Sequence, residues 1–310
     1  MTDKAKPTPT RATAAAATTG TTTGTTRTTT TATTATTATA TEAAAPFQFF
    51  DAQVGRVQRL TPSMARITFT GAGGRGLHGM ATAGRDQRIK LFLPHPGQGA
   101  PVMPPTQGPD WYTAWRALDP AVRGIMRTYT VRELESGELT VDFALHGGEA
   151  PASRWALDAA PGDRVGVLAP VESENSAYDY RPPQDTDWLL LTGDESALPA
   201  IAKILESVPP GTPVRAWLEL RSPADRQDLP VLPDAEVTWL VGTPTADAIR
   251  DAELPPGTPY AWIAGESATV RAVRRHLVTD RGFDRTRVKF TGYWRRGATE
   301  DQLLATNEAA

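Results

Sequence analysis

Residues 188–199 read WLLLTGDESALP, and this stretch decides the fold of the second half of the chain. Trp188 to Thr192 is a continuous apolar run, which is typical of a strand buried on both faces of a parallel sheet. A glycine turn follows, and Leu198 to Val208 then has the apolar spacing of a helix. A strand, a turn and a helix in this order predict one unit of an α/β domain.

The rest of residues 187–301 repeats this alternation. Further strands are predicted at Val214–Leu220, Glu236–Val241, Tyr260–Ala264 and Arg287–Thr291, and a further helix at Ser267–Thr279. Alternating strands and helices favour a parallel sheet with helices over its faces. We therefore predict a nucleotide-binding α/β domain over residues 187–301.

Two glycine turns follow strands of this predicted sheet, at the edge where ligands usually bind in α/β domains. Ser267 is the expected N-cap of the helix after the second turn. Because the chain has no GxGxxG fingerprint here, each turn is also compatible with a simple strand-to-helix connection. The candidate cofactor contacts are Thr192, Gly193, Asp194 and Glu195 in the first turn, and Gly265 and Glu266 in the second.

Charged residues follow the second strand of this domain. An acid such as Glu219 often binds the ribose hydroxyls of NADH, whereas arginines such as Arg221 and Arg226 accommodate the extra phosphate of NADPH. Arg221 is therefore a candidate cofactor contact, and the choice between NADPH and NADH stays open. Both arginines are alternatively solvated loop residues.

The first half, residues 46–172, has short alternating runs bounded by glycine and proline, which favour an antiparallel barrel or sandwich. Residues 94–119 interrupt the pattern with Trp111, Tyr112 and Trp115, either as a loop over a ligand or as a packed aromatic segment. The predicted strands are Gln53–Leu60, Ala65–Thr70, Arg88–Leu93, Gly124–Arg132, Leu139–Leu145 and Arg164–Leu168.

Two segments of this half have the side chains that a flavin site needs. Residues 127–130, RTYT, offer a cation for phosphate, an aromatic ring and hydroxyls, and alternation along a strand places Arg127 and Tyr129 on one face. Residues 146–155, HGGEAPASRW, are glycine-rich and then carry Pro151, which suits the first turn of a helix. Backbone N–H groups at such a helix start suit a pyrophosphate.

Composition excludes several other classes of function. The net charge of -3 provides no basic field of the kind that drives nucleic-acid binding. Without cysteine the chain cannot form disulfides, thiolate nucleophiles or cysteine-bound zinc and iron–sulfur sites. Its 4 histidines lack metal-ligand spacing, so we expect no protein-built metal site. A run of about 18 apolar residues, as a transmembrane helix requires, does not occur, so we expect no membrane insertion.

Residues 1–45 are almost wholly threonine and alanine and contain no Leu, Ile, Val or Phe. Such a segment cannot bury enough apolar surface to offset the entropy cost of ordering, so we expect it to be disordered. We predict a cytoplasmic protein with a flexible tail, or with a start codon assigned too early. An organelle transit peptide fits the scarcity of acids but not the lack of amphipathic bulk.

The motifs RTYT, DFALHG, PASRWA, PGDRV, LLLTGDESALPAI, WIAGES and GYWRRG follow one another between residue 47 and about residue 301. In this order the chain resembles the siderophore-interacting protein family, a branch of the ferredoxin-reductase-like flavoproteins. The resemblance implies an FAD-binding antiparallel β-barrel, an NAD(P)H-binding α/β domain and the reduction of ferric siderophores.

The family pattern also implies roles for single residues. It places Arg127 at the flavin phosphates, Tyr129 against the isoalloxazine ring or ribityl chain, and Thr130 near the reactive flavin nitrogen. Tyr129 and Thr130 are therefore the catalytic candidates, although Tyr129 is alternatively a core aromatic, and His146 a strand-end histidine. The further FAD-binding candidates are Thr128, His146, Gly147, Ala152 and Ser153.

A ferric siderophore is often anionic, so cations beside the flavin would help to dock it. The substrate-binding candidates are Lys90, Arg295 and Arg296, with Arg88 as a further one, and each is alternatively a solvated edge residue. Tyr293 and Trp294 would either pack over the flavin or seal the interface between the domains.

The implied reaction passes a hydride from NADPH or NADH to FAD, and single electrons from FAD to Fe(III). Siderophore oxygens favour Fe(III), so reduction lets the iron leave for assimilation. Two alternatives stay open: a flavin or ferredoxin-type reductase with another acceptor, and a non-catalytic siderophore-binding accessory protein. The sequence names neither the siderophore nor the oligomeric state.

Replacing Arg127 tests the flavin motif. Arg127→Ala is expected to weaken FAD binding by about 1.5–3 kcal/mol, because it removes a charge-assisted contact to phosphate. The Kd of FAD for the apoprotein, followed by flavin fluorescence, measures the effect. An unchanged FAD affinity would remove Arg127 from the predicted site.

Overall fold

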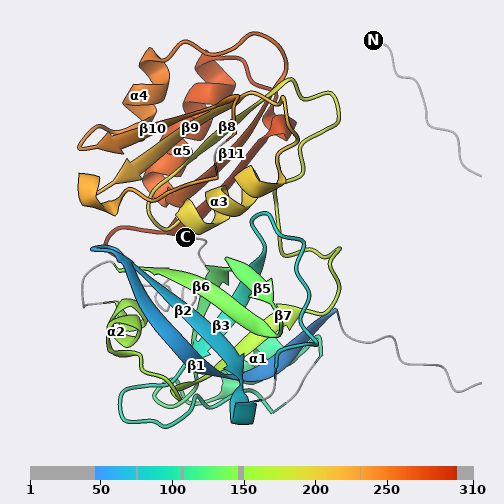
Figure 1. Ribbon diagram of the computed structural model, residues 1–310, viewed down its shortest axis with the longest axis vertical. Coiled ribbons are helices and arrows are strands. Elements are labelled where there is room, and N and C mark those ends of the chain that lie inside the picture. Colours follow the sequence, from blue (N-terminus) through green and yellow to red (C-terminus); the bar gives the residue numbers. More distant parts are fainter. Residues whose placement is uncertain (1–45, 75, 106–107, 146–149, 231, 299–310) are drawn as a thin grey trace, which may run out of the picture. The chain divides into compact units, whose positions relative to one another are not determined.

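The computed structural model describes residues 46–298 except 75, 106–107, 146–149 and 231. The Thr/Ala-rich segment 1–45 and the predicted flavin contacts His146 and Gly147 therefore lie outside the described residues. The described chain forms a seven-stranded antiparallel sheet followed by a five-stranded parallel sheet (Figure 1). This confirms the predicted pairing of an antiparallel β-barrel-type half with an α/β half.

The antiparallel sheet has the order β4-β3-β7-β1-β2-β6-β5. It curls into a half-barrel, with β4 and β5 as its edge strands (Figure 1). β5 is only three residues long and was not predicted as a separate strand. The strands are β1 (Phe47–Thr61), β2 (Met64–Gly71), β3 (Arg88–Leu93), β4 (Ile125–Thr130), β5 (Glu133–Glu135), β6 (Glu138–Ala144) and β7 (Arg164–Pro170).

Apolar side chains that alternate along these strands fill the interior of the half-barrel. Phe69 of β2 and Phe143 of β6 are fully buried there, with ring centroids 6.4 Å apart. The other face of β3 and β4 packs against α1 (Trp111–Ala117), whose Trp115 is buried and donates from indole Nε1 to the Gly124 carbonyl at 3.0 Å. The described part of residues 94–119 is thus a packed aromatic segment, the second of the two predicted alternatives.

The parallel sheet has the order β10-β9-β8-β11-β12. The direction of strand addition reverses between the central neighbours β8 and β11, which makes their carboxyl ends the usual place for a ligand. The strands are β8 (Trp188–Gly193), β9 (Val214–Leu220), β10 (Ala235–Val241), β11 (Pro259–Glu266) and β12 (Val288–Trp294).

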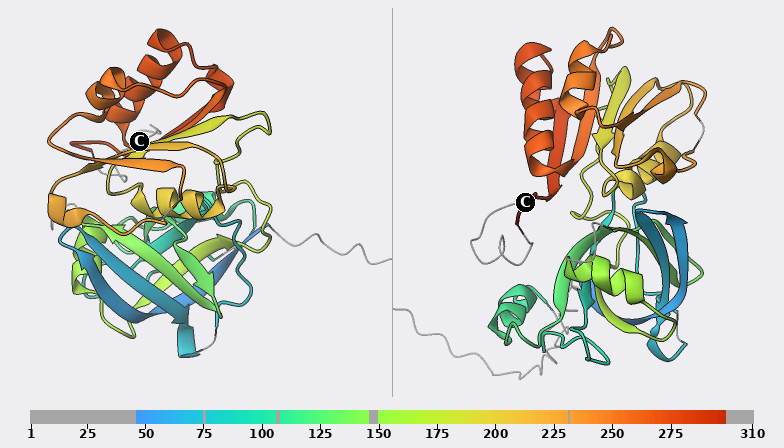
Figure 2. Two further views of the ribbon diagram at one scale, coloured as in Figure 1. Left: turned by 45° about the horizontal axis from the view of Figure 1, so that its top comes forward. Right: turned by 90° about the vertical axis from the view of Figure 1, so that its left-hand side faces the viewer.

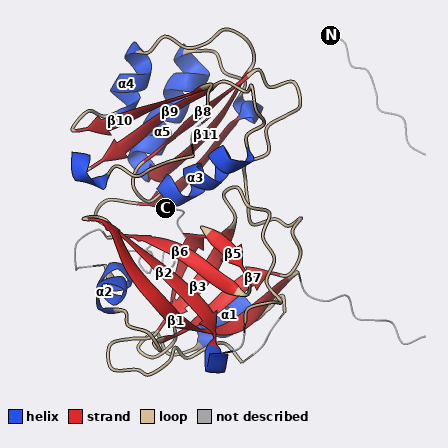
Figure 3. Ribbon diagram, in the orientation of Figure 1, coloured by secondary structure: helices blue, strands red, loops and turns tan. Residues whose placement is uncertain are grey.

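Helices cover both faces of the parallel sheet (Figure 3). α3 (Leu198–Ser207) packs on one face, while α4 (Thr245–Asp251) and α5 (Ser267–Arg275) lie side by side on the other (Figure 2). α4 has only seven residues and was not predicted. The predicted helix Ser267–Thr279 is α5, which continues as a π-helical turn at His276–Asp280.

Hydrogen bonds and packing join the half-barrel to the α/β half. The Asp225 carboxylate accepts from the Ser63 backbone N–H at 2.7 Å and from the Ser63 hydroxyl at 3.0 Å, in the turn between β1 and β2. Met64 of β2 belongs to the apolar core under α3. Arg132 and Glu206 form an ion pair of 2.9 Å between the same two halves.

Candidate functional site

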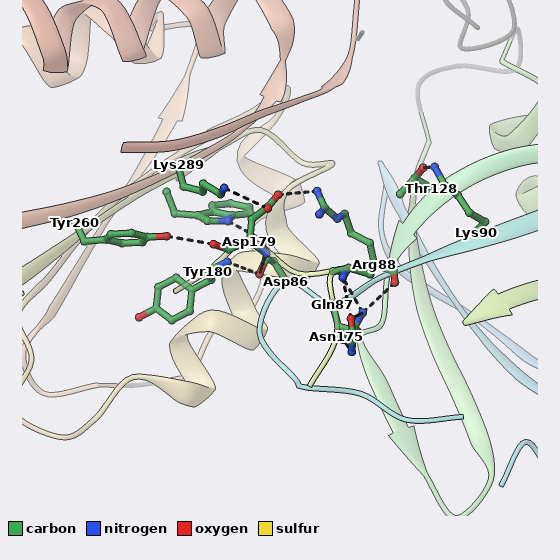
Figure 4. A network of polar contacts seen from close by, with 12 residues as sticks. Asp86, Gln87, Arg88, Lys90, Thr128, Asn175, Asp179, Tyr180, Tyr260 and Lys289 are labelled. Atoms are coloured by element: carbon green, nitrogen blue, oxygen red, sulfur yellow. Dashed lines mark hydrogen bonds and ion pairs between the residues drawn. The ribbon is translucent and has the colours of Figure 1, made fainter. Parts of the chain in front are cut away.

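The predicted flavin motif lies on β4, an edge strand of the half-barrel. Thr128 lies opposite Lys90 of β3, and the Lys90 ammonium donates to Thr128 Oγ1 at 2.6 Å (Figure 4). Tyr129 faces the apolar interior instead, with its ring centroid 4.3 Å from that of Phe143. Because strand residues alternate, the motif serves both faces of β4, and Thr128 and Tyr129 do not point to the same side.

The side chains of the RTYT motif, residues 127–130, differ in burial, in a way that suits a ligand with a charged end. Arg127 and Thr130 are buried, and the Arg127 Nη1 donates to the Met126 carbonyl at 2.7 Å. Tyr129 packs on the core and is still half-buried, so it combines the predicted core role with a partly open ring. A buried guanidinium is the side chain that best matches phosphate oxygens.

The helix predicted to begin at Pro151 is α2 (Pro151–Asp158). Ala152 and Ser153 in its first turn are buried, and the Ser153 hydroxyl donates to the Ala144 carbonyl at 3.3 Å. α2 packs against β4, so the fold brings the two predicted flavin segments together. A cation, a half-buried ring and a helix start at one edge of the half-barrel fit the phosphates and ring of FAD.

The two predicted glycine turns do meet at the carboxyl edge of the parallel sheet, and Asp194 joins them. Its Oδ2 accepts from the Glu266 N–H at 2.8 Å and from the Trp294 indole at 2.7 Å, and its Oδ1 accepts from the Ser196 N–H at 2.9 Å. A Cβ on Gly265, whose φ is +133°, would lie 2.7 Å from Asp194 Oδ2. The Asp194 side chain therefore ties the strand ends together, and its role as a cofactor contact stays a prediction.

Close packing likewise explains the first turn. A Cβ on Gly193 would stand 2.4 Å from that of Ala197 and 2.7 Å from the Ala264 carbonyl, so only glycine fits between β8, α3 and β11. The Thr192 hydroxyl donates to the Trp217 carbonyl of β9 at 2.8 Å. The close packing at Gly193 and the Thr192 hydroxyl thus serve the sheet itself, while a cofactor contact at this turn stays a prediction.

Arg221 is exposed, with 43% of its side chain accessible, but it is hydrogen-bonded to the protein. Its N–H donates to Glu195 Oε1 at 2.6 Å, its Nε lies 3.7 Å from the same oxygen, and its Nη1 donates to the Leu145 carbonyl at 3.0 Å. Glu195 is 5% exposed, so this carboxylate is also engaged internally. Arg226 is exposed, and its side chain has no partner in the part of the chain that the structure describes. The acid of this region, Glu219, accepts from the Thr245 hydroxyl at 2.6 Å.

Glu266 caps α5, a role that the sequence had assigned to Ser267. The Glu266 carboxylate accepts from the N–H groups of Ala268 and Thr269 at 2.7 and 3.0 Å. These N–H groups and that of Arg296 outweigh the opposing effect of burial, and the pKa of Glu266 is lowered. The Ser267 hydroxyl donates to the Trp294 carbonyl at 2.9 Å instead of capping the helix.

The candidate substrate cations differ in their surroundings. Arg88 is bound to Asp179 at 2.7 Å, so its guanidinium is part of a fixed ion pair (Figure 4). Arg296 is exposed next to the α5 cap, where its backbone N–H donates to Glu266 at 3.3 Å. Arg295 is half-buried and forms an isolated bridge with Ala298. The structure does not bring these arginines to Lys90 through any described contact.

Sequence reasoning missed Asp86, a carboxylate that is 1% exposed and precedes β3. It accepts hydrogen bonds from the N–H groups of Asp179 and Tyr180, close to Arg88 and Lys289 (Figure 4). An acid before a strand carries no recognisable signal, because its partners here are main-chain groups far away in sequence.

Neither a metal centre nor a membrane span is found in the described residues. They contain no group of three His, Asp or Glu side chains that could hold a metal ion. Among the described helices, none has the length and apolar character needed to cross a bilayer.

The titration of Glu195 makes the stability of the folded protein depend on pH, and the direction of this dependence follows from its pKa shift. Burial, the largest effect, raises the pKa of its carboxyl above the ordinary value of 4.5, against the lowering effect of Arg221. The folded protein thus holds this proton more tightly than the unfolded chain. The stability that Glu195 contributes is full below pH 4.5 and is lost as pH rises through the folded-state pKa.

Glu195→Gln removes this titration while keeping an oxygen acceptor for the Arg221 N–H. We expect the variant to gain stability relative to the parent protein as pH rises from 4.5 to about 7. Urea unfolding at several pH values measures the difference, and a difference that is constant or falls with pH contradicts the assignment.

Comparisons with known proteins agree with this geometry. Residues 53–174 match the model of the siderophore-interacting FAD-binding domain, and residues 186–297 match that of the siderophore-interacting protein. The NADPH-dependent ferric-chelate reductase of Escherichia coli is 31% identical over 80% of this chain and 93% of its own. Ferric vibriobactin reductase ViuB of Vibrio cholerae is 29% identical over 79% of this chain and 89% of its own.

The fold of this chain is similar to that of two solved structures. A siderophore utilization protein from T. fusca is 34% identical with a TM-score of 0.66, covering 82% of this chain and 95% of its own. A ferredoxin NADP+ reductase from Neisseria gonorrhoeae, at 14% identity and a TM-score of 0.53 over 81% of this chain and 100% of its own, shares the fold alone. The chain therefore belongs to the siderophore-interacting protein family, as an FAD-dependent oxidoreductase.

Proposed function

We propose that the protein reduces ferric siderophores with electrons from NADPH, through bound FAD, and so releases Fe(II) for iron assimilation in the cytoplasm. This proposal is supported by the contact between α2 and β4, the strand that carries the motif, inside the half that matches the FAD-binding domain. The names of the reductases from Vibrio cholerae and Escherichia coli support the choice of a ferric acceptor and of NADPH.

Each flavin-site residue has a task in this proposal. Arg127 binds the flavin phosphates, and the first turn of α2, with Ala152 and Ser153, offers backbone N–H groups to the pyrophosphate. Tyr129 supports the flavin ring, and Thr130 holds a hydroxyl near its reactive nitrogen. When bound, FAD supplies the conversion of one hydride into two single electrons.

The nicotinamide nucleotide belongs at the carboxyl edge of β8 and β11. Because the Asp194 and Glu266 side chains are engaged within the protein, the nucleotide would meet backbone groups of these turns. Arg226 is the stronger candidate for the extra phosphate of NADPH: both arginines are exposed just beyond β9, but the Arg221 side chain is bound to Glu195 and to the Leu145 carbonyl.

An anionic ferric siderophore would dock on Lys90 of β3, whose ammonium lies on the same side of the sheet as Thr128 of β4. Arg295 and Arg296, which follow β12, are further candidates for this contact. The siderophore oxygens hold Fe(III) more tightly than Fe(II), so reduction weakens the complex without any iron ligand from the protein.

An anaerobic absorbance titration tests the proposal. NADPH should bleach the bound flavin, and a ferric hydroxamate or catecholate siderophore should restore its absorbance while a chelator traps Fe(II). Bleaching without reoxidation would point to another acceptor, such as a ferredoxin. A failure of both NADPH and NADH to bleach the flavin would leave a non-catalytic binding protein.

A second test asks whether Arg226 sets a preference for NADPH over NADH. Arg226→Gln is expected to raise the KM for NADPH roughly tenfold or more and to leave that for NADH unchanged, because it removes one charge-assisted contact to phosphate. Arg221→Gln is the matched control and should affect both donors alike through the fold. An equal effect of Arg226→Gln on both donors contradicts a phosphate contact.

A further inference from the structure

We propose that Asp86 is a positioning residue for hydride transfer: it fixes Trp262 and Tyr293 so that the Tyr293 hydroxyl stands beside Thr130. This inference rests on the proposed reductase function and adds Asp86 and Trp262, which the sequence did not reveal, to the same site. Four features support it: the burial of Asp86, the donors that surround it, the contact between Trp262 and Tyr293, and the burial of the Tyr293 hydroxyl.

Asp86 is buried, and N–H groups surround its carboxylate. Its Oδ1 accepts from the Asp179 N–H at 3.1 Å and the Tyr180 N–H at 2.9 Å, while its Oδ2 accepts from the Asp179 N–H at 3.0 Å and the Trp262 indole at 3.1 Å. No cation within the described ranges forms an ion pair with it. A buried carboxylate is costly unless such donors satisfy it, so each of them is held in place.

The donors of Asp86 come from different parts of the chain. Asp86 itself precedes β3 of the half-barrel, Asp179 and Tyr180 lie in the connection between the two sheets, and Trp262 is on β11. In Figure 4 the Asp86 carboxylate lies next to Tyr180, and the Asp179 carboxylate is turned toward Lys289. One carboxylate thereby fixes the half-barrel, the connection and the parallel sheet to one another.

Trp262 passes this constraint on to β12. Its ring packs edge-on against that of Tyr293, at a centroid distance of 6.4 Å and an interplanar angle of 81°. Trp262 and Tyr293 both pack within the apolar core beneath α3. A shift of the indole would therefore shift the phenol, because close-packed interiors transmit displacement.

Tyr293 ends this line of contacts beside the predicted flavin motif. Its hydroxyl is buried, and the side chain that interacts with it is that of Thr130. Burial, and then the charge of Asp86, raise the pKa of Tyr293, so the phenol keeps its proton. A buried phenol in this place fixes where the Thr130 hydroxyl lies, next to the proposed flavin.

The other two tyrosines of this cluster serve as comparisons. Burial also raises the pKa of Tyr260, to about 12, and that of Tyr180. The Tyr260 hydroxyl, however, donates to the Asp179 carbonyl at 3.3 Å, within the connection (Figure 4). Tyr293 therefore differs from Tyr260 in that its hydroxyl meets Thr130 of the predicted flavin motif.

The experiment measures the two half-reactions separately in the FAD-loaded protein. Asp86→Asn and Tyr293→Phe are expected to slow flavin reduction by NADPH roughly 10- to 100-fold, as misplaced groups do. Reoxidation of the dithionite-reduced protein by a ferric siderophore should stay within about twofold. The double variant should be no slower than the slower single variant, because both changes act on one line of contacts.

Asp225→Asn is the matched control. Asp225 is equally buried, at 1% exposure, and also joins the two halves by accepting two hydrogen bonds, but from Ser63. If Asp225→Asn slows flavin reduction as much as Asp86→Asn, Asp86 merely docks the domains and the proposal fails. If Asp86→Asn does not fold, Trp262→Phe is the substitute variant. It keeps an aromatic ring but removes the indole N–H that donates to Asp86, and it must slow flavin reduction to the same extent.

Amide hydrogen exchange provides a readout that does not depend on activity. Asp86→Asn should lose protection at the Asp179 and Tyr180 amides, whereas Tyr293→Phe should keep it. Unchanged protection in Asp86→Asn would overturn the proposed anchor. Because flavin reduction by NADPH is measured without iron, a failure of ferric reduction would refute the proposed function and leave this test intact.

Discussion

Carboxylates that accept hydrogen bonds from N–H groups hold the functional edge of this protein together. Asp86 fixes the connection and the Trp262 indole, and Asp194 fixes the two turns after β8 and β11. Asp225 does the same at the turn between β1 and β2. Main-chain and indole donors have fixed directions, so such contacts set the place of whole strands, as long flexible ion pairs on a surface do not. The candidate cofactor site lies where strands fixed in this way end.

The strand-to-helix alternation of the second half was predictable because apolar runs such as Trp188–Thr192 are buried on both faces of the sheet. The helix start at Pro151 was predictable from proline geometry. α4 and β5 were missed because they are too short to show a period. The α5 cap was wrong for another reason: the Ser267 hydroxyl binds a carbonyl of β12, a contact that no local pattern contains.

The site shows the same division between local and long-range information. The motif on β4 and the first turn of α2 were found from residue types, and the fold brings them together. Asp194, Glu195 and Arg221 also lie where the sequence placed them, at strand ends, but their side chains bind distant backbone groups. Position along a strand could be predicted, whereas the choice between an internal partner and a ligand required the tertiary structure. Arg226, with its exposed side chain, shows how the nucleotide preference could still be encoded beyond β9.

In the proposed reaction the two electrons of the NADPH hydride reach the ferric siderophore one at a time through FAD. The most direct measurement is the anaerobic yield of chelated Fe(II) when limiting NADPH is added to the FAD-loaded protein with excess ferric siderophore. We expect two Fe(II) for each NADPH consumed, because one hydride carries two electrons and each Fe(III) accepts one. NADPH oxidation without Fe(II), or the same Fe(II) yield from protein stripped of FAD, would contradict it.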